Sequence, residues 1–192
     1  MIAATLCSGI GAPECAAPWI DWKWSAEIEP FPAAVHAHHF PGSVNLGDMT
    51  APDFVERSAA IALPDILVAG TPCQDFSIAG LRAGIAGDRG NLTLRFLEIA
   101  DAIDDLRRDA GLGPCWIVWE NVPGIFSTGN ALGTFLGGLV GHDAAIPKPR
   151  GGRWTRAGVV SGPRRCAAWR CLDAQAYRAL AAALRRLGRI AP

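Results

Sequence analysis

Short apolar runs alternate with helix-length segments through the first part of the chain, and this alternation constrains the fold more than any other feature. Such alternation is typical of a parallel sheet covered by helices. The predicted strands are Ile2–Leu6, Trp24–Ile28, Asp65–Ala69 and Trp116–Trp119. The predicted helices are Phe31–His39 and the amphipathic segment Leu92–Arg108. We therefore expect an α/β fold, with helices on both faces of a mostly parallel sheet.

Beyond about residue 140 the pattern changes. Residues 141–158 contain Gly, Pro and Arg without periodicity and predict a loop, after which Val159–Val160 predicts a short strand. Residues 174–187 carry Ala and Leu at helical spacing, which indicates a helix. A chain of 192 residues that is 50% hydrophobic can bury one substantial core. We expect residues 1–175 to form one domain and residues 176–192 a divergent basic tail.

Composition excludes several classes of protein. No run of about eighteen uncharged apolar residues is present, so no membrane span is expected, and the N-terminus lacks the pattern of a secretory signal. We therefore expect a cytoplasmic protein. The six cysteines form no C-x-x-C pair, and His36, His38 and His39 have no companion ligand pair. No metal site is predicted, and most cysteines are expected to be reduced and buried.

The neutral net charge hides a strong asymmetry between two parts of the chain. Residues 1–147 carry 7 Lys/Arg and 17 Asp/Glu, whereas residues 148–192 carry 11 Lys/Arg and only Asp173 as an acidic residue. A basic end attached to an acidic body is a reasonable footprint for binding a polyanion. It is equally consistent with a solvated basic tail that has no partner.

Two predicted strand ends carry residues suited to binding a nucleotide-like ligand. The first strand runs into the glycine turn Cys7–Gly11, and glycines at such a strand end let the backbone approach a ligand, although any tight turn also uses them. Glu27 ends the second strand, where a carboxylate can accept both hydroxyl hydrogens of a ribose. Asp48 is placed to face an adenine amino group at the end of a third strand. The alternative for each acid is an exposed strand end.

Two later strand ends carry residues suited to chemistry. Cys73 lies in the segment Gly70–Ser77 directly after a predicted strand and is preceded by Pro72, a position that favours reactivity over packing. The alternative is a buried structural thiol. The apolar run Trp116–Trp119 predicts a buried strand. Glu120 ends this strand, where we expect partial desolvation to favour the protonated acid. The alternative is a strand end that faces solvent.

Together these pieces resemble the DNA cytosine-5 methyltransferase family. Its motifs are matched in order by Gly9–Gly11, Glu27, Asp48, Pro72-Cys73-Gln74, Arg89-Gly90-Asn91-Leu92 and Glu120-Asn121-Val122. The similarity extends from about residue 3 to about residue 175 and is strongest to phage-type members. It implies a Rossmann-like S-adenosylmethionine-dependent methyltransferase fold. It further implies S-adenosylmethionine as the cofactor and double-stranded DNA, with a flipped cytosine, as the partner.

The resemblance also assigns roles to individual residues. On the catalytic side it implies that Cys73 attacks cytosine C6, that Glu120 protonates N3 and that Asn121 positions the adjacent loop. It places Pro72 and Gln74 beside Cys73 in the catalytic motif, and it implies that the Gln74–Ser77 loop, which includes Phe76, closes over the base. On the cofactor side it implies contacts, from the methionine end to the adenine, by Cys7, Gly9, Gly11, Glu27, Ile28, Asp48 and Leu92.

The sequence departs from the family in its first motif, where Ala12 also replaces a frequent glycine, and at its C-terminus. Thr5 stands where members usually have an acidic residue, and after Gln175 the expected Gln-Arg-Arg motif and recognition region do not follow. We therefore expect a catalytic domain that is incomplete at its C-terminus, through truncation and a frameshift near Gln175. The alternatives are an RNA cytosine-5 methyltransferase, an inactive binding module, or half of a split enzyme that a second chain completes with the missing recognition region.

Overall fold

The computed structural model describes residues 1–72, 92–173 and 175. The sequence predictions for Cys73, Gln74, Phe76 and Ser77 lie outside the described residues, as does nearly all of the helix predicted over residues 174–187.

The core of the molecule is a five-stranded sheet in which every strand pairing is parallel. Its strands are β1 (Ile2–Leu6), β2 (Asp21–Ala26), β3 (Val44–Asn45), β4 (Ile66–Ala69) and β5 (Trp116–Trp119). Their order is β3-β2-β1-β4-β5, so the direction of winding reverses between β1 and β4. In such sheets ligands bind beyond the carboxyl ends of the strands at this reversal. The topology therefore points to the edge formed by Cys7, Glu27, Gly70 and Glu120.

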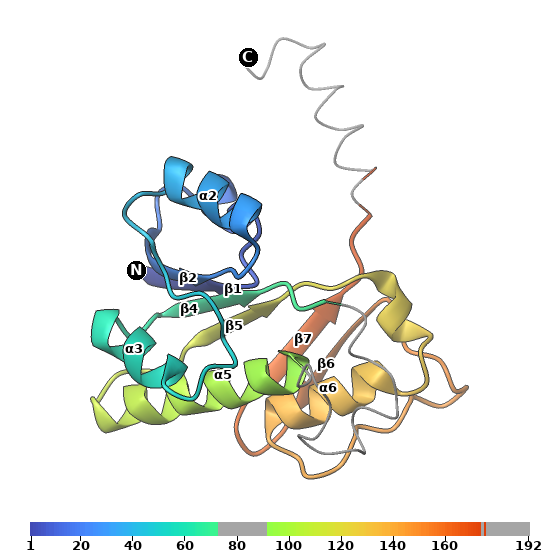
Figure 1. Cartoon of the computed structure of the whole chain (residues 1–192). Helices are drawn as coiled ribbons and strands as arrows, with labels where there is room; N and C mark the ends of the chain where they lie inside the picture. The colour runs from blue at the N-terminus through green and yellow to red at the C-terminus, as the bar shows by residue number, and fades with distance from the viewer. Residues whose placement is uncertain (73–91, 174, 176–192) are drawn as a thin grey trace.

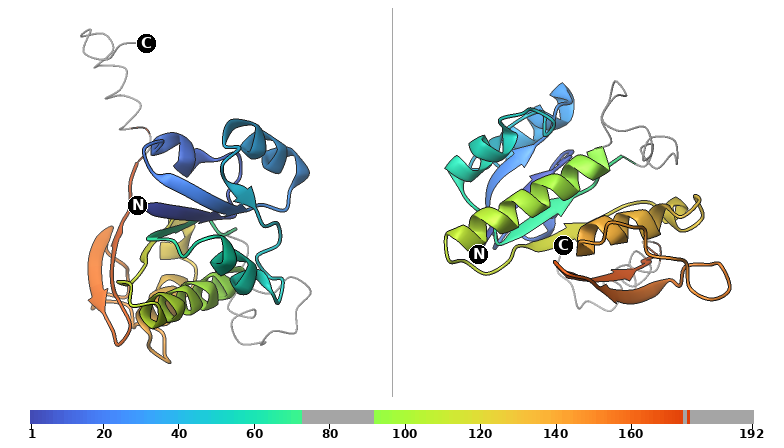
Figure 2. Two further views of the ribbon diagram at one scale, coloured as in Figure 1. Left: turned by 90° about the vertical axis from the view of Figure 1, so that its left-hand side faces the viewer. Right: turned by 90° about the horizontal axis from the view of Figure 1, so that it is seen from below.

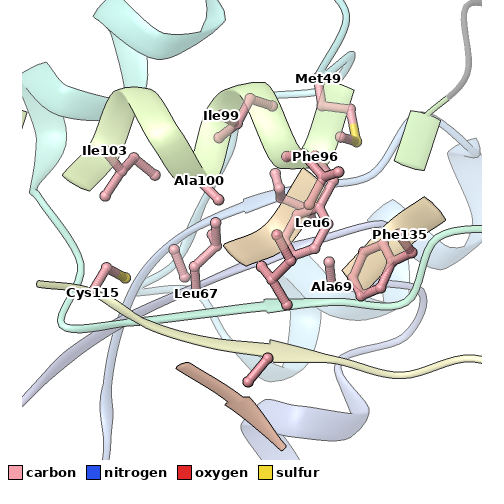
Figure 3. Close-up of a cluster of buried hydrophobic side chains, with 14 of the residues drawn as sticks. Leu6, Met49, Leu67, Ala69, Phe96, Ile99, Ala100, Ile103, Cys115 and Phe135 are labelled. Atoms are coloured by element: carbon pink, nitrogen blue, oxygen red, sulfur yellow. The ribbon is translucent and has the colours of Figure 1, made fainter. Parts of the chain in front are cut away.

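Helices cover both faces of this sheet. The chain forms α1 (Ala12–Ala16), α2 (Pro30–His39), α3 (Phe54–Ile61) and α5 (Leu92–Asp109). In Figure 1, α2 lies on one side of the sheet and α3 and α5 lie on the other. Helix α5 presents Phe96, Ile99 and Ile103 to Leu6 and Leu67 of the strands, as the close-up in Figure 3 shows. Burying each such side chain stabilises the fold by roughly 1.5–3 kcal/mol, so α5 fixes the central strands and their carboxyl ends.

A second unit packs along the middle of α5, near Leu97, Asp101 and Asp104. It consists of the 3-10 helix η2 (Pro123–Phe126), α6 (Ala131–Val140) and an antiparallel hairpin of β6 (Ala157–Ser161) and β7 (Cys166–Arg170). Figure 2, seen from below, shows this hairpin lying along α6. The apolar sequence of α6 is explained by burial, because eight of its ten residues are buried. Phe135 of α6 stacks on Trp119 of β5 with ring centroids 3.8 Å apart, which joins the two units.

Most predicted elements are confirmed, with several corrections. β1 and β5 have the predicted bounds, whereas β2 ends at Ala26, so Glu27 and Ile28 follow the strand instead of lying within it. Helices α3 and α6 and strand β7 were not predicted. The prediction that β5 is buried was wrong, because Trp116 is 76% exposed. β5 is the last strand in the order, and the described residues leave one of its faces uncovered.

Within the described ranges, no helix combines the length and the apolar character needed to cross a membrane.

Candidate active site at the carboxyl edge of the sheet

The loop after β1 has the backbone conformation of a ligand-binding turn. Cys7 has a φ of 52°, in the left-handed region that costs a residue with a side chain roughly 1–2 kcal/mol, and such strain is concentrated at functional sites. Gly9 has a φ of 53°, and a Cβ placed there would meet no atom within 4 Å. Gly9 therefore faces open space, and its lack of a side chain leaves room for a ligand to approach the backbone.

Glu27 holds this loop against the end of β2. Its Oε2 accepts a hydrogen bond from the Gly9 N–H and its Oε1 accepts one from the Glu29 N–H, each at 2.8 Å. The Asn45 side chain accepts from the Glu27 N–H and donates to the Glu27 carbonyl, both at 3.0 Å. The carboxylate is thus fixed at the ends of three neighbouring strands. Each of its oxygens has a further lone pair with which to accept a hydroxyl.

The same side of the edge carries the residues expected to meet an adenine ring. Ile28 is 64% exposed and neighbouring Phe31 is 75% exposed, so both offer apolar surface to a flat ring. Asp48 is exposed and accepts hydrogen bonds from the Thr50 N–H at 2.8 Å and the Thr50 hydroxyl at 2.7 Å. Arg95 of α5 donates to the Met49 carbonyl at 3.0 Å, which anchors the Asp48 loop to the helix. Phe31, Asn45 and Arg95 were not identified from the sequence.

A buried polar cluster supports the loop from below. The Thr5 hydroxyl donates to Glu14 Oε1 at 2.7 Å, and His36 Nε2 lies 3.0 Å from the same oxygen. Glu14 is 0% and His36 1% exposed, and the Thr5 hydroxyl also lies 2.8 Å from the Ser8 hydroxyl. The cluster therefore ties β1, its loop, α1 and α2 together. The cluster has no local signal in the sequence, because Glu14 and His36 are 22 residues apart and meet only through helix packing.

Position 11 requires a glycine for a different reason from position 9. It is buried with a φ of 88°, and a Cβ there would lie 2.3 Å from Cε2 of Phe40. The glycine is therefore required by the close packing of the start of α1 against Phe40 at the end of α2. This matches the role of a glycine that permits close packing in a nucleotide-binding turn.

The ends of β4 and β5 are joined by short polar contacts. The Asn121 amide donates to the Thr71 carbonyl at 2.8 Å, and the Trp119 indole N–H donates to the Thr71 hydroxyl at 2.9 Å. The Glu120 N–H donates to the Ala69 carbonyl at 2.9 Å, and a Cβ built on Gly70 would lie 3.7 Å from Glu120 Oε2. The Glu120 carboxylate therefore lies beside the segment that leads to Pro72, the last described residue before Cys73.

Glu120 differs from the sequence prediction in one respect. It is exposed, so the partial desolvation expected of a strand-end glutamate is not provided by the described residues. The reason is the position of β5 at the end of the described sheet, which leaves Val118 49% exposed as well. Leu92, expected to line the cofactor site, begins α5 and is partly buried against the core.

Comparisons with known proteins bear on this arrangement. Residues 3–139 match the model of the C-5 cytosine-specific DNA methylase family. The chain is 46% identical over 196 residues to a protein of Escherichia phage P1 named DNA N-6-adenine-methyltransferase, a match that covers 90% of this chain and 26% of the relative. It is 33% identical over 138 residues to an orphan methyltransferase of Bacillus phage rho11s, covering 67% and 24% respectively. The chain thus spans about a quarter of the length of these relatives.

Among solved structures, a mutant of Spodoptera frugiperda DNMT2 has a similar fold. The TM-score is 0.52 at 24% sequence identity, and the match covers 72% of this chain and 40% of that one. Together with the strand order, this confirms the expected fold class, a Rossmann-like α/β methyltransferase fold with a mostly parallel sheet and helices on both faces.

Proposed function

Because the chain belongs to the C-5 cytosine-specific DNA methylase family, whose methyl donor is S-adenosylmethionine, we propose that it methylates C5 of cytosine in DNA through a covalent adduct with Cys73. One observation carries the proposal. At the end of β5, the Glu120 N–H donates to the Ala69 carbonyl and the Asn121 amide donates to the Thr71 carbonyl, both at the end of β4, and Cys73 follows Pro72 in the same segment. An acid and a nucleophile from adjacent strands are the pair that this chemistry requires.

A nucleophile is needed because cytosine C5 is too weakly nucleophilic to take a methyl group directly. Addition of the Cys73 thiolate to C6 forms a C–S bond and moves the electrons of the C5–C6 double bond into the ring, which makes C5 resemble an enamine. The thiolate is the reactive form of cysteine, so nearby positive charge or loop amides must favour it.

Glu120 is the general acid of the proposed reaction. As the thiolate adds at C6, electron density moves toward N3, and a proton from Glu120 neutralises it. Glu120 is exposed in the described structure, so a base bound against it would supply the shielding that the chain alone lacks. Asn121 positions the adjacent loop that leads to Cys73, because its amide donates to the Thr71 carbonyl at 2.8 Å. Gln74, Phe76 and Ser77 are proposed to surround the base.

S-adenosylmethionine, when bound, supplies an electrophilic methyl group carried on a sulfonium sulfur. C5 takes that methyl group, and the donor departs as the neutral thioether. Solvent water then takes the C5 proton, and the electrons of that C–H bond re-form the C5–C6 double bond as the C6–S bond breaks. N3 returns its proton to Glu120, and the Cys73 thiolate is released. Each bond that forms with the protein therefore breaks again, and the enzyme is regenerated.

The residues at the ends of β1, β2 and β3 fit this methyl donor. Gly9 leaves space for the methionine end beside Cys7, and Gly11 shapes the turn. Glu27 has spare lone pairs for the ribose hydroxyls, Ile28 offers an apolar surface to the adenine, and Asp48 accepts from its amino group. Leu92 is proposed to line the site at the start of α5. The strained turn and the open space at Gly9 support this assignment.

Double-stranded DNA is the proposed substrate. A cytosine stacked in a duplex cannot present C6 to a thiolate, so the base must be flipped out at a cost of a few kcal/mol. An RNA cytosine would need the same protein groups, so only an experiment distinguishes RNA from DNA as the substrate.

Adenine N6 is a second candidate acceptor, because the phage P1 relative is named for that activity. This chain matches 26% of that relative, so the named chemistry need not reside in the matched part. The exocyclic nitrogen of adenine also needs no covalent adduct at a ring carbon. The presence of Cys73 and Glu120 therefore favours cytosine.

The identity of the methylated base tests the proposal. The protein is incubated with labelled S-adenosylmethionine and either duplex DNA or RNA, and the nucleosides are analysed by mass spectrometry. We expect 5-methylcytosine from DNA, lost in Cys73→Ser and kept in Cys115→Ser. N6-methyladenine, or 5-methylcytosine from RNA alone, would contradict the proposal.

A further inference from the structure

The β6–β7 hairpin has a defined orientation relative to the candidate active site. At its open end the Trp154 indole N–H donates to the Asn130 side chain at 3.3 Å, and Asn130 is the N-cap of α6. Near its tip the Arg164 N–H donates to the Val140 carbonyl at 3.0 Å, where α6 ends. The start of α6 follows η2, and η2 follows Glu120-Asn121-Val122 directly. The open end of the hairpin therefore lies toward Glu120, and the tip lies away from it.

The basic side chains at the two ends of the hairpin differ in whether they form ion pairs. Residues 148–170 contain seven Lys or Arg and no Asp or Glu. Near the tip, Arg165 pairs with Asp101 at 2.6 Å and with Asp104 at 2.9 Å, and Arg164 pairs with Asp105, so these cations fasten the hairpin to α5. The remaining cations are Lys148, Arg150 and Arg153 in the loop before β6 and Arg156 and Arg170 at the open end. Within residues 1–72, 92–173 and 175 none of the five forms an ion pair, and Arg156 donates to Cys171 Sγ at 3.8 Å.

The unpaired cations are held on a rigid support. Register places Arg170 opposite Ala157, and the Cys171 N–H donates to the Arg156 carbonyl at 2.6 Å, so Arg156 and Arg170 lie at the same open end of the hairpin, on its two faces. The Trp169 indole N–H donates to the Thr155 carbonyl at 3.0 Å, and its ring meets that of Trp154 edge to face at 5.5 Å.

The outward residues of both strands are mostly small. Besides Arg170 they are Ala157, Val159, Ser161, Cys166 and Ala168. A flat surface with exposed cations at one end is therefore presented beside the active-site edge.

We propose that this open end, through Arg153, Arg156 and Arg170 with support from Lys148 and Arg150, contacts the phosphates of the duplex whose cytosine enters the site. The choice of DNA as partner rests on the proposed function. Phosphate contacts from Arg and Lys fix the position of a protein on a duplex without reading its sequence. Residues 1–147 carry ten more acidic than basic residues and would repel DNA, so a local cationic surface is needed near Glu120.

The salt dependence of binding tests the proposal. Each phosphate contact contributes about −0.9 to the slope of log K against log salt concentration. For the whole chain on a duplex of about 20 base pairs, R156Q/R170Q should reduce the magnitude of the slope by about 2. The matched control K23Q/R108Q removes the same charge from exposed surface ion pairs and should leave the slope within experimental error. The proposal would be overturned if R156Q/R170Q had the same slope as the wild type. It would also be overturned if R156Q/R170Q and K23Q/R108Q lost the same amount of slope.

Two further measurements distinguish a loss of DNA contact at this surface from a loss of the Cys73 chemistry and from misfolding of a variant. Duplex DNA should protect Arg153, Arg156 and Arg170 of the wild-type protein from phenylglyoxal, and Arg108 should stay reactive; the reverse pattern would overturn the proposal. Cys73→Ser should keep the wild-type salt slope even if the chemistry assigned to Cys73 is wrong. Tighter binding of single-stranded RNA than of the duplex would overturn the assignment of DNA.

Discussion

The two halves of the carboxyl edge, at the ends of β1, β2 and β3 and at the ends of β4 and β5, differ in how firmly hydrogen bonds hold their side chains. At β1, β2 and β3, Glu27 has both oxygens bonded, Asn45 fixes its backbone, and a buried cluster centred on Glu14 supports the loop. At β4 and β5, two side-chain contacts to Thr71 hold the ends together, and Glu120 is exposed. Within the described residues, no hydrogen bond or ion pair fixes the Glu120 carboxylate.

This difference suggests a division of labour. A half that is already organised loses little conformational freedom when a ligand binds, which suits tight binding of a cofactor. A half that is open to solvent can receive a large flipped base and become shielded only when that base is present. We therefore expect substitutions in the first half to change affinity or stability, and substitutions in the second half to change turnover.

The largest effect is expected from Glu120→Gln. Loss of a general acid typically lowers the rate by about 10²–10⁴-fold, and the amide cannot deliver the proton to N3. Affinity for S-adenosylmethionine should change by less than about twofold, since Glu120 is assigned to the other half of the edge. Single-turnover kinetics and calorimetry measure the two quantities. The control is Glu29→Gln, at an exposed residue in the other half of the edge. A comparable loss of rate in Glu29→Gln would contradict the assignment of turnover to the β4–β5 half.

Glu14→Ala should have the next largest effect, and on stability. Removing one partner of a buried charged or polar pair typically costs about 3–5 kcal/mol, because the other is left without compensation. His36 and Thr5 would lose their shared acceptor. Urea unfolding measures the change. The matched control is Glu98→Ala, which breaks an exposed pair with Arg95 and should cost less than about 1 kcal/mol. Equal losses would show that the buried cluster is not the support inferred for it.

Glu27→Gln should weaken cofactor affinity. A hydrogen bond to a charged group is worth about 1.5–3 kcal/mol, so the dissociation constant for S-adenosylmethionine should rise roughly 10- to 100-fold. The rate with saturating cofactor should stay near that of the wild type. An unchanged dissociation constant, measured by calorimetry, would remove Glu27 from the binding half.

The smallest effect concerns Asp65, at the opposite edge of the sheet from both halves. Its pKa is lowered from the ordinary value because the carboxylate accepts the Ile2 N–H and pairs with Arg107. A lowered pKa in the folded state contributes stability above about pH 4, and that contribution is lost as the pH falls through the folded value. Asp65→Asn should therefore be slightly less stable than the wild type at pH 7 and indistinguishable from it near pH 2. A stability difference that persists at pH 2 would contradict this origin.

Much of the fold followed from local sequence pattern. The apolar runs Ile2–Leu6 and Trp116–Trp119 became strands with the predicted bounds, and the helix predicted over Leu92–Arg108 ends one residue later in the structure. Strand-end residues could be predicted because parallel strands place their carboxyl ends at one edge.

Other features depend on long-range packing and left no local signal. The Glu14–His36 contact exists only because α1 and α2 pack together, and Asn45 acts only because β3 lies beside β2. The exposure of Trp116 depends on strand order, since the same apolar run in a central position would be covered. Which basic residues of the β6–β7 hairpin form ion pairs depends on where α5 places its aspartates.

Covalent trapping tests the assignment of Cys73 as the nucleophile most directly. With S-adenosylmethionine and duplex DNA containing 5-fluorocytosine, C5 carries no proton to lose, so the thiol adduct cannot be eliminated. We predict an adduct that survives denaturation, maps by peptide mass spectrometry to Cys73, and disappears in Cys73→Ser. Burial raises the pKa of Cys115 to about 12, so that thiol stays protonated and Cys115→Ser should trap normally. An adduct at a different cysteine, or none with protein shown to bind both the duplex and the cofactor, would contradict the proposed chemistry.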